Sequence, residues 1–120
     1  LTTNATARLM AEIALKKAVT PTRSEQMLEL MKRDWEGEVK NAEDQTHGFT
    51  GIALKNLNLK GAKLWSKAGW TSTAHHDVAY IETTDGLKLV ICVYTEKFAK
   101  ERDILPSVAG IILQNLGKTN

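Results

Sequence analysis

The chain has 120 residues, a length that fits one domain with a modest hydrophobic core. Its formal net charge of +2 is too small to indicate a nucleic-acid-binding protein, and no basic cluster is interleaved with aromatic residues. No apolar run approaches the roughly 20 residues that span a bilayer, so no membrane span is expected. The sequence starts at Leu1 rather than at a methionine, and we therefore expect a piece of a longer protein.

The first part of the chain, residues 1–35, is predicted to form a pair of helices. Apolar residues at helical spacing predict the first helix over residues 5–17, capped by one of residues 2–4. Thr20 followed by Pro21 is a strong start signal for a second helix, which we expect to run to about residue 34. The apolar stripe of this second helix consists of Met27, Leu28, Met31 and Trp35.

Residues 36–62 are predicted to be a loop. Residues 36–48 are polar and without pattern, and a loop of this length is uncommon unless it is functional or mobile. Residues 49–59 are apolar in patches and read as irregular chain or a short helix that leads into the sheet.

Three strands are predicted next, over residues 63–71, 75–83 and 87–95, so that residues 63–96 form the sheet. Thr84-Asp85-Gly86 has the residues of a tight hairpin turn, which makes the sheet antiparallel. The second and third strands are apolar on both faces, so both faces are expected to be covered by other layers. The chain has few residues left to form covering layers on both faces.

A closing helix is predicted over residues 104–116, with Asp103 as its cap and Gly117 after its end. The expected fold class is therefore α+β, a three-stranded antiparallel sheet with flanking helices in the order α-α-β-β-β-α. We expect residues 1–120 to form a single, partial domain.

The segment Lys67-Ala68-Gly69-Trp70, on the first strand, is the strongest candidate site. The lysine places a positive charge beside the strand, and the small residues after it let a substrate approach the strand's amides. Such amides can donate hydrogen bonds to a developing oxyanion. By spacing alone the signal is weak, and a surface lysine beside a structural glycine is the favoured explanation of the segment.

The run from Ser66 to Thr71, followed by residues 75–82, resembles the C-terminal part of class A β-lactamases and of related serine hydrolases. The helix pair before the strand is similar to the one in that family. The resemblance implies that the backbone amide of Trp70 donates to an oxyanion, and that the substrate is bound by Lys67, Ala68, Gly69 and Thr71. The family motif is Lys-Thr/Ser-Gly, and Ala68 departs from it because alanine has no hydroxyl.

The family's other two motifs do not occur in the chain. No serine is followed three residues later by a lysine, and there is no Ser-Asp-Asn, so the nucleophile segment is absent. In the family both motifs precede the part that this chain resembles, together with two further strands and the first helix of the domain.

His75, His76 and Asp77, with His47 elsewhere, are a weaker candidate for a metal site. Neighbouring residues on a strand point to opposite faces, so His75 and His76 cannot easily share one ion. The preferred interpretation is that one histidine packs and the other is solvated. Cys92, the one cysteine, lies in an apolar run and is predicted to be a core residue.

Two functional hypotheses follow from these residues. In the first, the chain is the C-terminal portion of a β-lactamase-like serine hydrolase that acts on β-lactams or related amides and esters, and it is inactive alone. In the second, it is a non-catalytic, self-associating binding or structural module derived from that fold. The expected partner is the missing N-terminal part or a second copy, with a β-lactam or peptide-like ligand. No cofactor or metal is expected, and the resemblance implies a periplasmic or extracellular location.

Overall fold

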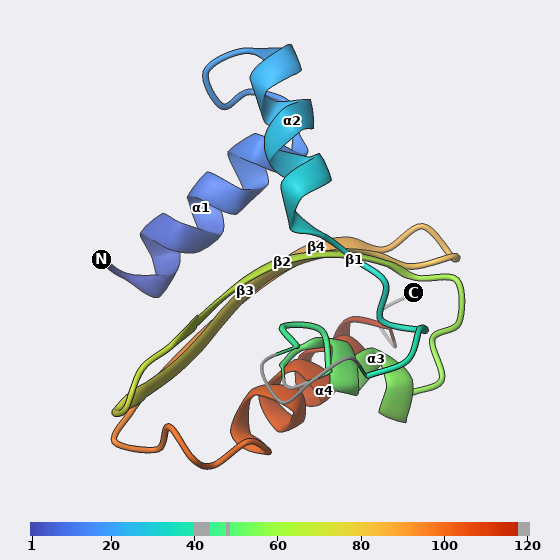
Figure 1. Ribbon diagram of the computed structural model, residues 1–120. Helices are drawn as coiled ribbons and strands as arrows, with labels where there is room; N and C mark the ends of the chain where they lie inside the picture. Colours follow the sequence, from blue (N-terminus) through green and yellow to red (C-terminus); the bar gives the residue numbers. More distant parts are fainter. Residues whose placement is uncertain (40–43, 48, 118–120) are drawn as a thin grey trace.

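The computed structural model describes residues 1–39, 44–47 and 49–117. It shows an α+β fold in three layers, with α1 and α2 on one face of an antiparallel sheet and α3 and α4 on the other (Figure 1). The helices are α1 (Thr3–Ala14), α2 (Pro21–Met31), α3 (Gly51–Asn56) and α4 (Ile104–Leu116). The strands are β1 (Lys32–Arg33), β2 (Lys63–Trp70), β3 (Ala74–Glu82) and β4 (Lys88–Glu96).

The sheet has four strands in the order β1-β2-β3-β4, so the predicted three-stranded sheet was one strand short. The additional strand, β1, is only two residues long and follows α2 directly, where the sequence predicted continued helix to about residue 34. A strand this short contains no alternation that a sequence pattern could show. The three predicted strands are present, and the predicted hairpin turn joins β3 to β4, with Gly86 at φ +93°.

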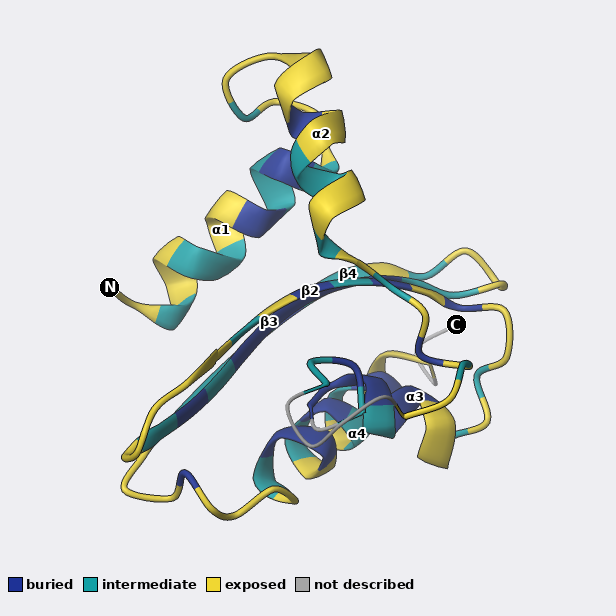
Figure 2. Ribbon diagram, viewed as in Figure 1, coloured by how far each residue is buried: buried dark blue, intermediate teal, exposed yellow. Residues whose placement is uncertain are grey.

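Both faces of the sheet are covered, as the doubly apolar strands predicted, and the helices of this chain do the covering (Figure 2). Ala79 and Ile81 of β3 point into the larger core, beneath α3 and α4. Val78 and Tyr80 of the same strand point into the smaller core, beneath α1. Most side chains of β4 are only half-buried, which shows that β4 is less well covered than β3. One of these is Cys92, which packs against the smaller core, and burial raises the pKa of its thiol.

Trp35 lies on the α3/α4 side of the sheet. Its predicted place in the second helix implied the α1/α2 side. The chain crosses the sheet edge at β1, and Trp35 then enters the larger core, where its indole is 5% exposed. The indole Nε1–H donates to the carbonyl oxygen of Ala62 at 2.7 Å. The reason is the early end of α2, which takes Trp35 off the helix altogether.

A short helix, α3, interrupts the region that was predicted to be loop over residues 36–62. It matches the short-helix alternative for residues 49–59. Its first residue must be glycine, because a Cβ on Gly51 would lie 2.3 Å from the carbonyl oxygen of Thr46. Within the described ranges 1–39, 44–47 and 49–117, no helix is both long and apolar enough to cross a membrane.

Two of the predicted helix starts can be compared with the structure. Thr20 caps α2, and its hydroxyl oxygen accepts a hydrogen bond from the backbone N–H of Arg23 at 3.1 Å, as predicted. Asp103 precedes α4 but makes no side-chain capping bond, because its backbone is already helical (φ −85°, ψ −17°). The closing helix itself spans the predicted residues 104–116.

We expect Thr20→Ala to lower the free energy of unfolding by about 1 kcal/mol, because it leaves an N-terminal amide of α2 without its acceptor. Thr20→Ser keeps a hydroxyl and serves as the control. Urea denaturation of the three proteins measures the difference. An alanine variant as stable as the serine variant would contradict the capping role.

Candidate functional site

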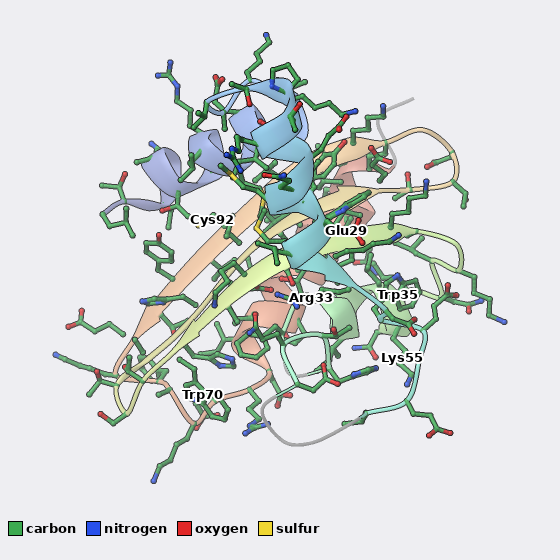
Figure 3. The ribbon with its side chains drawn as sticks, turned by 45° about the horizontal axis from the view of Figure 1, so that its top comes forward. Glu29, Arg33, Trp35, Lys55, Trp70 and Cys92 are labelled. Carbon is green, nitrogen blue, oxygen red and sulfur yellow. The ribbon has the colours of Figure 1, made fainter. Side chains whose placement is uncertain are left out.

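The candidate site is the free edge of β2, defined here as residues 66–70. β1 pairs only with the start of β2, in the register Lys32↔Trp65 and Arg33↔Leu64. Beyond that point β2 continues for five residues with β3 on one side and, within the described part of the chain, no strand on the other. Figure 3 shows Arg33 where the chain leaves β1 and Trp70 toward the end of the strands.

Two contacts show which backbone groups point outward from this edge. The N–H of Ala68 donates to Oε1 of Gln45 at 3.2 Å, and the carbonyl oxygen of Ser66 accepts from Nη2 of Arg33 at 2.7 Å. Backbone groups of alternate residues point the same way in an antiparallel sheet, so the N–H of Trp70 also points to the free edge. The N–H of Thr71 points the other way, to the carbonyl oxygen of Ala74 at 2.9 Å.

Lys67 and Gly69 lie on the α1/α2 side of the sheet, because they are two and four residues after Trp65, which packs in the smaller core. Both residues are exposed, and Nζ of Lys67 donates to the carbonyl oxygen of Ala68 at 2.5 Å. A Cβ on Gly69 would meet only the side chain of His76, at 3.7 Å. The face beside Lys67 is therefore open to a ligand.

Trp70 lies on the other side of the sheet and is fixed by ring contacts. Its indole stacks on the ring of His75 with the centroids 5.5 Å apart, and meets Phe49 edge-on at 6.4 Å. The guanidinium carbon of Arg102, from the segment before α4, lies 4.5 Å from the centre of the indole, which is a cation–π contact. These contacts hold the residue whose amide points to the free edge.

Thr71 lies just beyond β2, in the turn to β3. Its hydroxyl oxygen accepts from the N–H of Thr73 at 3.2 Å and from that of Ala74 at 3.0 Å. The hydroxyl therefore stabilises the turn at the end of the site strand.

Asp77 and His75 are buried beneath the free edge, opposite Ala68 and Trp70 in the register of β3. The Asp77 side chain is on the α3/α4 side, 2% exposed, and its Oδ2 accepts from the N–H of Thr50 at 3.1 Å. Burial raises the pKa of Asp77 to about 6. Burial lowers the pKa of His75, and the nearby Arg102 and His76 lower it further.

His75 is buried, as the prediction of one packed histidine implied. His76, on the opposite face, was predicted to be solvated but is half-buried, with its ring 4.4 Å from that of Tyr94 between centroids. The N–H of Thr95 donates to Nδ1 of His76 at 3.1 Å, which ties this ring to β4.

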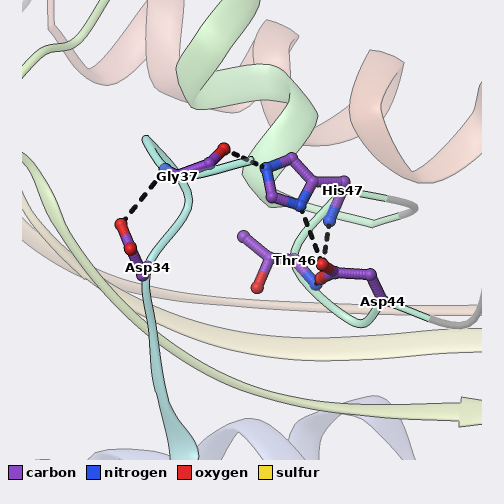
Figure 4. A network of polar contacts seen from close by, with 5 residues as sticks. All are labelled: Asp34, Gly37, Asp44, Thr46 and His47. Atoms are coloured by element: carbon purple, nitrogen blue, oxygen red, sulfur yellow. Dashed lines mark hydrogen bonds and ion pairs between the residues drawn. The ribbon is translucent and has the colours of Figure 1, made fainter. Parts of the chain in front are cut away.

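His47 lies in a separate polar network (Figure 4). There, Nδ1 of His47 is 3.1 Å from Oδ2 of Asp44, and its Nε2 is 3.1 Å from the carbonyl oxygen of Gly37. Over the described ranges, no three His, Cys, Asp or Glu side chains come together as a metal site would require.

Four residues around the free edge were not identified from the sequence as parts of this site: Arg33, Gln45, Asp77 and Arg102. Asp77 had a usable signal, since a carboxylate inside an apolar strand must either be paired or have a shifted pKa. The other three had none, because an exposed polar residue looks the same in sequence whether or not it contacts a distant strand.

The model of the beta-lactamase enzyme family matches residues 1–116. A comparison with curated protein sequences gave no significant match.

The chain is similar to several solved structures, among them the following three. PBP-A is 18% identical with a TM-score of 0.72, and a point mutant of PBP-A, an acyl-enzyme complex with penicillin G, is 18% identical with a TM-score of 0.74. The alignment covers 93% of this chain and 38% of the other chain in both cases. A β-lactamase from Sphaerobacter thermophilus is 19% identical with a TM-score of 0.67, covering 92% of this chain and 38% of the other.

The chain therefore spans about 38% of the length of these structures, and they show its fold. The family match extends over nearly the whole chain. The chain belongs to the beta-lactamase enzyme family, of whose fold it is a part.

Proposed function

We propose that the chain supplies one wall of the acylation site of a β-lactamase-like serine hydrolase, and that the nucleophilic serine comes from residues outside these 120. The observation that carries the proposal is the free edge of β2, where the outward N–H of Trp70 and the exposed Lys67 lie within one short segment. The sequence has no serine followed three residues later by a lysine, so no serine in it has that activating group.

The proposed chemistry is acyl transfer. The serine oxygen attacks the carbonyl carbon of an amide or ester, negative charge develops on the carbonyl oxygen, and the amine or alcohol leaves with a proton. The N–H of Trp70 donates to that oxygen. Such a hydrogen bond stabilises the transition state most when the donor is already in position before the reaction. The ring contacts of Trp70 with His75 and Arg102 fix it. The Lys67 ammonium binds a carboxylate of the substrate.

β-Lactams are the substrate class that the relatives suggest. One similar structure is an acyl-enzyme with penicillin G, and another is a β-lactamase. A related amide or ester would use the same two groups. Ala68 offers no hydroxyl to a substrate carboxylate, so we propose acylation and do not extend the proposal to rapid turnover.

Labelling with a fluorescent penicillin tests the proposal. We expect no covalent labelling of the 120-residue chain alone, and labelling of the longer protein encoded by its reading frame, at an upstream serine of a Ser-x-x-Lys motif. Denatured gel electrophoresis followed by peptide mapping locates the label. Covalent labelling of the chain by itself would show that the nucleophile is not elsewhere.

The second candidate is the non-catalytic, self-associating module. Its supporting observation is β4, the last strand of the sheet in the described residues, whose side chains are mostly half-buried. A second copy that pairs along β4 would cover them. A natural start codon near Leu1 together with a dimer in sedimentation supports the module. A monodisperse monomer counts against it.

A further inference from the structure

Gln45 takes the place of a neighbouring strand at the free edge of β2. Its Oε1 accepts from the N–H of Ala68 at 3.2 Å and also from Nη2 of Arg33 at 3.0 Å. The same Nη2 donates to the carbonyl oxygen of Ser66 at 2.7 Å, and Nε of Arg33 lies 3.3 Å from the Ser66 hydroxyl. Two side chains thus bond the carbonyl oxygen of Ser66 and the N–H of Ala68, two of the backbone groups that a longer β1 would have paired.

A local turn encloses Gln45, and the chain after it is tied to the sheet. Before it, the Asp44 carboxylate accepts from the N–H of Thr46 at 2.8 Å, which closes a tight local turn. After it, the N–H of Thr50 donates to the buried carboxylate of Asp77, the residue opposite Ala68 in β3. The side-chain amide of Gln45 reaches the N–H of Ala68 from this turn.

The hydrogen bond from Gln45 distinguishes the outward N–H of Ala68 from the outward N–H of Trp70. The N–H of Ala68 is already bonded to Gln45, whereas the N–H of Trp70 comes two residues later, at the end of β2. Two residues of strand span about 6.6 Å. A carbonyl bound at Ala68 would therefore lie several ångströms from the position at which Trp70 would hold it. A small cyclic amide cannot contact both amides with one oxygen.

We propose that Gln45 is a specificity-determining positioning residue, which blocks the amide of Ala68 so that an acyl carbonyl binds at the amide of Trp70. The inference rests on the proposed function, since it takes the free edge of β2 to be where the substrate binds. Gln45 does not touch the reacting atoms. It acts by removing a competing, unproductive binding mode.

Amide hydrogen exchange of the 120-residue chain tests the contact itself. Gln45→Leu has a similar size without an acceptor, and Gln45→Glu keeps the oxygen and its attraction to Arg33. We expect the Ala68 amide to exchange about fivefold faster in the leucine variant, the size of effect that one lost hydrogen bond gives. The glutamate variant should exchange no faster than the wild type, because its carboxylate still accepts from the Ala68 N–H. Equal Ala68 exchange in all three proteins would overturn the proposal.

Penicillin acylation of the longer protein tests the role in specificity. Unproductive binding at Ala68 lowers the limiting acylation rate and the half-saturating penicillin concentration by the same factor, so their ratio is unchanged. We expect both the limiting acylation rate and the half-saturating concentration to fall in Gln45→Leu. If the freed Ala68 amide makes one net hydrogen bond to the penicillin, each should fall by about threefold or more. Gln45→Glu should keep the wild-type values. A lower rate with an unchanged or higher half-saturating concentration would mean a merely structural role and would overturn the proposal.

The two experiments separate the failure of this inference from that of the proposed function. If no form of the longer protein is labelled, the proposed function is wrong and the specificity role falls with it, whatever the exchange result. If the longer protein is labelled but the Ala68 amide exchanges equally in all variants, only the role of Gln45 is wrong.

Discussion

Lys67→Ala is expected to slow the acylation of the longer protein by penicillin about 10- to 100-fold. The exposed ammonium of Lys67 lies on the α1/α2 face of β2, next to Ala68 and Gly69. A charge-assisted hydrogen bond to a substrate carboxylate contributes roughly 1.5–3 kcal/mol, and each 1.4 kcal/mol corresponds to about a factor of ten. Stopped-flow or gel-based labelling rates over a range of penicillin concentrations measure the effect.

Lys63 provides a matched control within the same strand. Lys63 lies at the other end of β2, is also exposed, and is on the same face as Lys67. In the strand register it is opposite Glu82 of β3. Lys63→Ala removes the same charge four residues away and should leave the acylation rate within about twofold, since exposed charges this far apart are well screened. Equal effects of the two substitutions would show that only net charge matters, and an unaffected Lys67→Ala variant would remove Lys67 from the site.

Asp77→Asn is expected to stabilise the chain progressively as the pH rises from 4 to 7. Burial raises the pKa of Asp77 from 3.8 to about 6, so between these values the folded chain holds a proton that the unfolded chain has lost. The free energy of unfolding of the wild type therefore falls as the pH rises through this window, by up to roughly 3 kcal/mol. Asparagine does not titrate, and its amide oxygen can still accept from Thr50.

Urea unfolding of both proteins at pH 4, 5, 6 and 7 measures this prediction as the difference between their stabilities. Asp85→Asn is the control, because the pKa of Asp85 is lowered, mainly by the Thr83 hydroxyl. Its ionised form is favoured by folding, so its asparagine variant should show a small dependence of the opposite sign. A stability difference for Asp77→Asn that stays flat from pH 4 to 7 would mean that the carboxyl keeps its ordinary pKa.

The strands and the closing helix could be predicted because their signals are local. In β3 and β4 the apolar residues on each face alternate with period two, and residues 84–86 provide the turn between them. Residues 104–116 carry an apolar stripe at helical spacing, and the observed α4 has the same bounds. The short strand β1 and the crossing at Trp35 could not be predicted, since two residues of strand depend on the partner strand and not on their own sequence.

The candidate site was predicted only in part for a related reason. Lys67, Ala68, Gly69 and Trp70 are consecutive, so a short motif could identify them, and their roles remain a proposal. Gln45 lies 23 residues from Ala68 in sequence, and Arg33 lies 33 residues from Ser66. A single sequence carries no signal for a hydrogen bond between residues so far apart.

The sequence by itself determined the α+β order of elements, the two apolar faces of the sheet and the likeness to β-lactamases, because each depends on residues close together along the chain. The tertiary structure alone decided that β1 stops early, and that Arg33 and Gln45 then bond to the outward groups of Ser66 and Ala68. The physical reason is that a strand edge must satisfy its backbone groups, and which distant side chains do so depends on how the chain folds back.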